Sequence, residues 1–211
     1  MSDITAERPD HRCLFDVATE QQGYFTTDQA HACGFAWRSL HHHVQHGRFL
    51  HVRRGLYRLR DFPPSSNEEV MAAWLAAGRE DAAISHESAL DLLDLADVIP
   101  TSVQVTVPRS RRGLAPPSGT TIHTTVHPLS PDEVTMRGGI RITAAARTIV
   151  DVAEAGIGPE QVELAVASAL ERGITTANEL RDTAQTRNLR VTHLIDRALS
   201  RAQRLHVPAP E

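Results

Sequence analysis

Arginine and histidine side chains are concentrated in one stretch of the sequence, where they could bind phosphates and base edges of a nucleic acid. Residues 29–60 contain six arginines and six histidines but no aspartate or glutamate. The protein as a whole is acidic, with a formal net charge of −4. An acid-free basic block on an acidic protein is typical of a phosphate-binding surface, because an ordinary solvated surface mixes charges of both signs.

Part of this basic stretch has the pattern of a helix, which we predict over residues 36–46. Trp37, Leu40 and Val44 have the spacing of a buried helix face and are expected in the core. At 100° per residue the opposite face carries polar and basic groups: Arg38, Ser39, His42, Gln45 and His46. Arginine pairs with guanine, glutamine with adenine, and serine with bases or phosphates. This face therefore fits a DNA major groove.

A β-hairpin is predicted directly after this helix, over residues 48–60. Apolar residues alternate with polar ones on both sides of a turn that begins at Arg54. The hairpin tip presents Arg53 and Arg54, which could reach a minor groove or the flanking phosphates. Arg58 and Arg60 lie on one face of the return strand and are expected to add phosphate contacts.

Two shorter helices must position this surface, and they are predicted over residues 11–22 and 26–33. The second begins at Thr26, which is followed three residues later by Gln29. This is the spacing of a capping box, in which each of the two side chains accepts a hydrogen bond from the backbone N–H of the other residue. Three short helices separated by glycines and followed by a hairpin predict a winged helix-turn-helix DNA-binding domain over residues 1–62. Thr27, at the start of the second helix, is added to the expected DNA contacts.

Residues 67–211 follow a linker rich in proline and serine, and they mix strand and helix patterns. Strands are predicted over 102–107 and 120–127, with a hairpin over 134–143. Helices are predicted over 66–77, 85–95, 144–155, 159–172, 176–185 and 189–205. A small sheet with surrounding helices predicts a mixed α/β domain, and the fold class of the whole chain is therefore α+β.

The residues predict neither a catalytic site nor a metal site. His42 and His46 are four residues apart, a spacing that two metal ligands could share, but no third or fourth ligand is evident nearby. His86 lies at a predicted helix start, where polar side chains are expected as caps. Arg147 and Asp151 have the spacing of an ordinary helix ion pair. No cofactor is expected, and the protein is not expected to be an enzyme.

The cysteine content, the first ten residues and the lack of long apolar segments bear on the cellular location of the protein. Cys13 and Cys33 provide neither a disulfide framework nor a set of four zinc ligands, and we expect them to be small buried side chains of one N-terminal core. Residues 1–10 lack the pattern of a secretion signal, and no apolar run is long enough to span a membrane. A cytoplasmic protein is therefore expected. All 22 basic residues are arginine, which excludes any mechanism that needs a catalytic lysine.

Five motifs carry a family resemblance through their order and spacing. They are Gly23-Tyr-Phe-Thr-Thr27, the stretches 47–57, 84–90 and 142–151, and Val105-Thr-Val-Pro108, which follows Pro100. Together they resemble the AbiEi-type antitoxins of type IV toxin–antitoxin systems over about residues 14–155. The resemblance implies a winged helix that represses its own operon by binding double-stranded operator DNA. It also implies a C-terminal antitoxin domain that counteracts a nucleotidyltransferase-like toxin, without requiring a stable complex.

Two other functions stay open. The first is a ligand-responsive winged-helix regulator whose C-terminal domain senses a small molecule. The second is a nuclease, because similar N-terminal regions are joined to restriction-nuclease-like domains. Such nucleases generally combine acidic metal ligands with a lysine, and the absence of lysine counts against this alternative.

Overall fold

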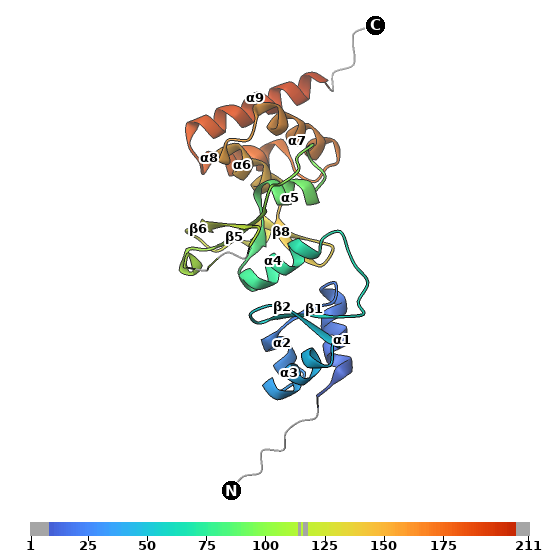
Figure 1. Cartoon of the computed structure of the whole chain (residues 1–211). Helices are drawn as coiled ribbons and strands as arrows, with labels where there is room; N and C mark the ends of the chain where they lie inside the picture. The colour runs from blue at the N-terminus through green and yellow to red at the C-terminus, as the bar shows by residue number, and fades with distance from the viewer. Residues whose placement is uncertain (1–8, 114, 116–117, 206–211) are drawn as a thin grey trace. The chain divides into compact units, whose positions relative to one another are not determined.

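A computed structural model describes residues 9–113, 115 and 118–205 (Figure 1). Residues 1–8, which make up most of the segment in which no secretion signal is expected, lie outside the described residues. The chain divides into two units, residues 1–79 and 80–211. Each unit combines helices with a sheet, which confirms the α+β fold class. In the part of the chain that is described, no helix is both long and apolar enough to cross a membrane.

The first unit has the element order of a winged helix-turn-helix, followed by one more helix. Its elements are α1 (His11–Glu20), β1 (Tyr24–Thr26), α2 (Thr27–Ala32), α3 (Trp37–Gln45), β2 (Phe49–Arg53), β3 (Leu56–Leu59) and α4 (Glu68–Gly78). The three strands form an antiparallel sheet in the order β1-β3-β2. The predicted helices and the hairpin are confirmed, whereas β1 was not predicted.

Local capping and a shared core hold these short helices in place. The Asp10 side chain accepts hydrogen bonds from two backbone amides at the start of α1. The predicted capping box of α2 is present, with the Thr26 hydroxyl and the Gln29 amide as its two side chains. Helices this short are marginal alone, so burial of their apolar faces stabilises them. The buried core of the unit includes Leu14, Ala18, Phe25, Ala30, Phe35, Leu40, Phe49 and Tyr57.

A disulfide joins Cys13 and Cys33 in this unit, which corrects the prediction of two unpaired side chains. Both residues belong to the N-terminal core, as expected. Cys13 lies on α1 and Cys33 is the C-cap residue of α2, and their Cα atoms are 5.7 Å apart. Because the packing of α1 against α2 creates this proximity, the spacing of the two cysteines in the sequence gives no sign of it.

The second unit is a five-stranded sheet with helices. Its strands are β4 (Ala83–Ile84), β5 (Val103–Pro108), β6 (Thr120–Thr125), β7 (Val134–Arg137) and β8 (Ile140–Thr143). Its helices are α5 (His86–Leu92), α6 (Ala145–Ala155), α7 (Pro159–Glu171), α8 (Ala177–Gln185) and α9 (Leu189–Leu205), with 3-10 turns η1 (Arg109–Arg111) and η2 (Pro131–Glu133). The strand order is β6-β5-β4-β8-β7, with the β5–β6 and β4–β8 pairs parallel.

Helices α6 to α9 lie together on one side of this sheet (Figure 1). Helix α6 is buried along most of its length, and Ile149 and Val150 are fully enclosed. The four predicted helices of this region are confirmed with bounds that agree within one residue. Strand β4 was missed, although it occupies the centre of the sheet. The second unit thus has the small sheet and surrounding helices that the sequence predicts.

Candidate nucleic-acid interface

Helix α3 is anchored in the first unit by one apolar face. The Leu40 side chain is fully buried, His43 is buried, and Val44 packs against the core as a partly buried side chain. The structure places four of the predicted DNA contacts on the exposed surface of this helix and a fifth in a half-buried position. These are Arg38, His42, Gln45 and His46, with Ser39 half-buried. The helix therefore offers a polar and basic surface that no described acidic residue of the helix interrupts.

Trp37 does not lie in the core, and this prediction was wrong. Its side chain is 63% exposed, and its ring makes an edge contact with His31 at a centroid distance of 5.7 Å. The core near the start of α3 contains Phe35, which is fully buried. Trp37 therefore adds a large aromatic surface next to Arg38.

His42 and His46 make contact with each other on the exposed face of α3. Their ring centroids are 3.9 Å apart, and Nδ1 of His46 lies 2.8 Å from the backbone oxygen of His42. Among the described residues, no group of three or more histidine, cysteine, aspartate or glutamate side chains could hold a metal ion. Both rings are accessible as hydrogen-bond donors to a nucleic acid.

The hairpin of β2 and β3 places Arg53 and Arg54 at the predicted turn. Arg54 is exposed, and Arg53 is partly buried with a buried Nη1 atom that has no hydrogen-bond partner in the described structure. Gly55 has a φ of +76°, the left-handed conformation that favours glycine in a tight turn. The Thr27 amide donates a hydrogen bond of 3.0 Å to the Gly55 oxygen. Thr27 therefore connects the start of α2 to the hairpin turn.

Arg58 is not exposed, as a phosphate contact would require. Its side chain is buried, and its Nη2 atom donates to Glu68 Oε1 at 2.7 Å and to the Pro63 oxygen at 2.9 Å. Its guanidinium also lies 5.5 Å from the centre of the Tyr24 ring. Because Arg58 is paired with Glu68 at the start of α4, it is not available for the expected phosphate contact.

Within the described part of the chain, the other arginines of the basic block have no acidic partners. No ion pair among the described residues involves Arg38, Arg48, Arg53, Arg54 or Arg60. Burial, followed by the nearby His11 and Arg48, lowers the pKa of His43, so this inward-facing ring is neutral. The positive charge of the block is thus carried by arginines that have no ion-pair partner among the described residues.

The order helix, strand, helix, helix and hairpin, with the sheet β1-β3-β2, defines the class of winged helix-turn-helix proteins. Residues 14–60 match the family described as "Transcriptional regulator, AbiEi antitoxin". This match confirms the resemblance to AbiEi-type transcriptional regulators over residues 14–60.

Solved structures with a similar fold exist, and one of them aligns with most of this chain. It is the crystal structure of the RV2827C protein from Mycobacterium tuberculosis, with a TM-score of 0.59 and 15% sequence identity. The alignment covers 94% of this chain and 82% of that chain. At this identity the likeness concerns the fold alone. A search of the curated proteins finds no match.

Proposed function

We propose that the protein is a DNA-binding transcriptional autorepressor and the antitoxin of a type IV toxin–antitoxin system. One observation carries the proposal: α3 and the hairpin present exposed arginines that have no acidic partner among the residues described, in the region that matches the AbiEi family. Such arginines are free to replace the counterions of DNA phosphates. The proposed contacts are Thr27, Arg38, Ser39, His42, Gln45, His46, Arg53 and Arg54.

In the proposed complex, α3 lies in the major groove as the recognition helix. Arg38, close to the N-terminal end of α3, is the strongest candidate for reading a base, because the first residues of a recognition helix contact base edges. Arg54 at the hairpin tip contacts a phosphate or a minor groove. Residues 1–62 supply this DNA-binding domain.

Residues 67–211 are proposed as the antitoxin domain. Its partner is a nucleotidyltransferase-like toxin, which it counteracts with or without a stable complex. The protein acts in the cytoplasm as a regulator and not as an enzyme. The matching family is described as an antitoxin, but the match covers residues 14–60 and not this domain, so the assignment of residues 67–211 rests on the family resemblance alone.

The DNA-binding part is tested with the DNA upstream of the protein's own gene. A gel shift should give a specific complex whose binding constant falls steeply as salt concentration rises. Arg38→Ala should weaken this complex by about 1–3 kcal/mol if Arg38 reads a base. Arg137→Ala is the matched control, because it removes an exposed arginine from the second unit and should leave binding unchanged. Absence of binding at low salt would contradict autorepression.

The antitoxin part is tested in cells that express a nucleotidyltransferase-like protein encoded beside this gene. Co-expression of the full chain should restore growth, and so should Arg38→Ala, because toxin neutralisation is assigned to residues 67–211. Continued growth arrest with the wild-type chain would contradict the antitoxin function without affecting the DNA-binding result.

A ligand-responsive regulator is the second candidate function, and it shares the same DNA-binding unit. A cavity of about 650 Å³ in the second unit favours it. A molecule that binds this cavity and changes the affinity for operator DNA would support this candidate over the first.

A further inference from the structure

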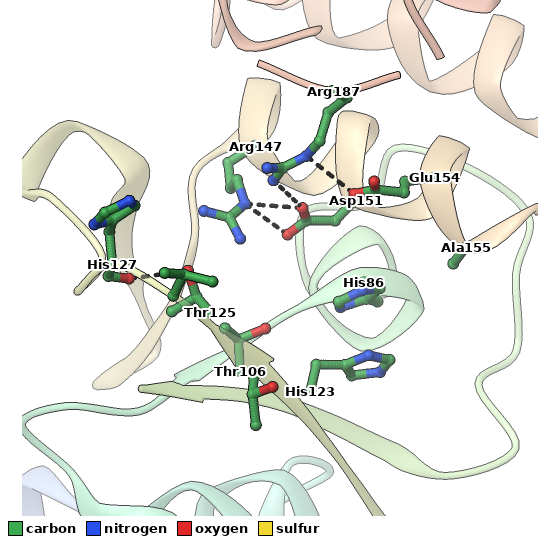
Figure 2. Close-up of a pocket in the computed structure, with 12 residues that line it drawn as sticks. His86, Thr106, His123, Thr125, His127, Arg147, Asp151, Glu154, Ala155 and Arg187 are labelled. Carbon is green, nitrogen blue, oxygen red and sulfur yellow. Dashed lines mark hydrogen bonds and ion pairs between the residues drawn. The ribbon is translucent and has the colours of Figure 1, made fainter. Parts of the chain in front are cut away.

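Two sequence motifs of the second unit meet at the cavity that Figure 2 shows. His86 comes from residues 84–90, and Arg147 and Asp151 come from residues 142–151. The remaining lining comes from β5, from the end of β6 and the residues after it, from the end of α6, and from Arg187 between α8 and α9. A cavity of about 650 Å³ is within the range of small-molecule sites.

The backbone holds His86 in an uncommon conformation at the edge of this cavity. Its φ is +53°, a left-handed value that non-glycine residues rarely adopt and that clusters at ligand sites. Thr106 Oγ1 donates to Ser85 Oγ at 2.8 Å, and Ser85 Oγ lies 2.9 Å from His86 Nδ1. This geometry allows the Ser85 hydroxyl to donate its single proton to Nδ1, and in that tautomer a neutral His86 ring carries its own proton on Nε2. The Nε2–H group is then a donor for a ligand.

A second histidine stacks on the first. The rings of His86 and His123 have centroids 3.6 Å apart and an interplanar angle of 17°. Burial, and next the neighbouring His123, lowers the pKa of His86 to about 4. Burial also lowers the pKa of His123. The Nε2 atom of His123 is buried and has no hydrogen-bond partner among the described residues.

Two guanidinium groups are fixed in the cavity wall by the buried carboxylate of Asp151. Arg147 Nε donates to both Asp151 oxygens at 2.8 Å, and Arg187 Nη2 donates to Oδ1 at 2.9 Å (Figure 2). Arg147 Nη1 donates to Glu133 at 2.7 Å, and Arg187 Nε lies 3.0 Å from Glu154. The carboxylates thus orient both guanidinium groups.

Each guanidinium keeps N–H groups for a ligand. In the described structure, Nη2 of Arg147 and Nη1 of Arg187 have no hydrogen-bond partner, and neither belongs to the fully buried unpartnered atoms. Both Asp151 oxygens are already occupied, and Glu154 is the remaining carboxylate of the lining. The cavity is therefore richer in donors than in acceptors, which suits an acceptor-rich ligand.

We propose that this cavity binds a small organic oxyanion, a phosphate- or carboxylate-bearing molecule, through the free N–H groups of Arg147 and Arg187 and the Nε2–H group of His86. Guanidinium groups held by a carboxylate are well suited to such oxygens, because their planar N–H groups match the geometry of phosphate and carboxylate. The residues of this site all lie in the second unit, so the proposal does not rest on the proposed DNA-binding function.

Protonation of a histidine should accompany binding. His86 faces His123 from β6, Asp151 and Arg147 from α6, and Arg187 from the segment between α8 and α9. The three carboxylates Glu133, Asp151 and Glu154 already outnumber the two guanidinium groups, and a bound anion makes this excess of negative charge larger. Uptake of a proton by the histidine pair relieves this excess, and affinity should therefore rise as the pH falls.

The test is calorimetric titration of the full chain with inorganic phosphate, AMP, adenosine and succinate at pH 6 and pH 8. We expect one binding site per chain. It should bind phosphate and AMP, or succinate, or all three, and it should not bind adenosine. Phosphate and AMP without succinate identify a phosphate site, and succinate alone identifies a carboxylate site. Affinity should be higher at pH 6, by a factor that cannot exceed about tenfold per pH unit for one linked proton.

The variant His86→Asn removes the imidazole while keeping a residue that tolerates a left-handed backbone. It should weaken oxyanion binding by about tenfold, the loss expected for one hydrogen bond to a charged group, and it should flatten the pH dependence. His193→Asn makes the same change at an exposed position of α9 and should have no effect. In the wild-type chain, a bound oxyanion should also raise the pH midpoint of a histidine ring resonance. The absence of binding by every oxyanion, or unchanged affinity and pH dependence in His86→Asn, would overturn the proposal.

Discussion

Arg54 and Arg58 lie on the same hairpin in opposite surroundings, and this difference allows a test of which arginines contact DNA. Arg54 is exposed at the turn and has no described ion-pair partner, so Arg54→Ala should leave stability unchanged. If Arg54 contacts a phosphate, the variant should reduce the magnitude of the slope of log K against log salt by about 0.9. The measurement is a salt titration of operator binding.

Arg58→Ala is the contrasting variant. It leaves Glu68 without its partner at a half-buried position, where the Glu68 side chain is 30% exposed. We expect a loss of about 1–2 kcal/mol in the free energy of unfolding and an unchanged salt slope. A reduced salt slope for Arg58→Ala, with Arg54→Ala unchanged, would reverse our assignment of the two residues.

Trp37 and Leu40 both lie on α3, and they too differ in burial. Leu40 is fully buried, and Leu40→Ala should lower the free energy of unfolding by about 2–5 kcal/mol. Trp37 is 63% exposed, and Trp37→Ala should change it by less than about 1 kcal/mol. Urea unfolding of the two variants measures the difference. Equal losses would indicate that Trp37 is packed in the core after all.

At the scale of elements, the disulfide between α1 and the end of α2 stabilises the first unit by restricting its unfolded state. The two cysteines are 20 residues apart, and a loop of this size corresponds to about 3 kcal/mol. Reduction should lower the free energy of unfolding of this unit by about that amount, as measured by urea unfolding with and without dithiothreitol. The double variant Cys13→Ala, Cys33→Ala should be insensitive to the reductant, and equal sensitivity of both proteins would argue against the bond.

The elements that the sequence predicts well are those with local signals. Helix α2 has its capping box, α9 has a long amphipathic pattern, and the hairpin has a turn between alternating strands. Strands β1 and β4 have three and two residues, too few for an alternation to be visible. Their existence depends on pairing with strands elsewhere in the chain, which no local pattern encodes.

At the scale of the whole molecule, the two candidate sites differ in how far apart in the sequence their residues lie. The basic surface comes from one continuous stretch, so its exposed helix face could be predicted, apart from the position of Trp37 and the ion pair of Arg58. The cavity combines side chains from five separate segments of the second unit. The spacing of Arg147 and Asp151 correctly predicts an ion pair, but only the packing of α6 against the α8–α9 connection adds Arg187. Assembly from distant segments conceals such a site from sequence analysis.

The buried histidine of this cavity also makes the stability of the molecule depend on pH. The pKa of His86 is about 4 in the folded protein, below the value of about 6.5 for an unfolded chain. Between these values the unfolded state binds more protons, so stability is complete above about pH 6.5 and falls as the pH falls towards 4. This loss amounts to about 2–3 kcal/mol between pH 7.5 and pH 4.5. Urea unfolding across this range should show a steeper loss for the wild-type chain than for His86→Asn, whereas His193→Asn should follow the wild type. The same pH profile in all three proteins would mean that His86 titrates in the folded state as it does in an unfolded chain.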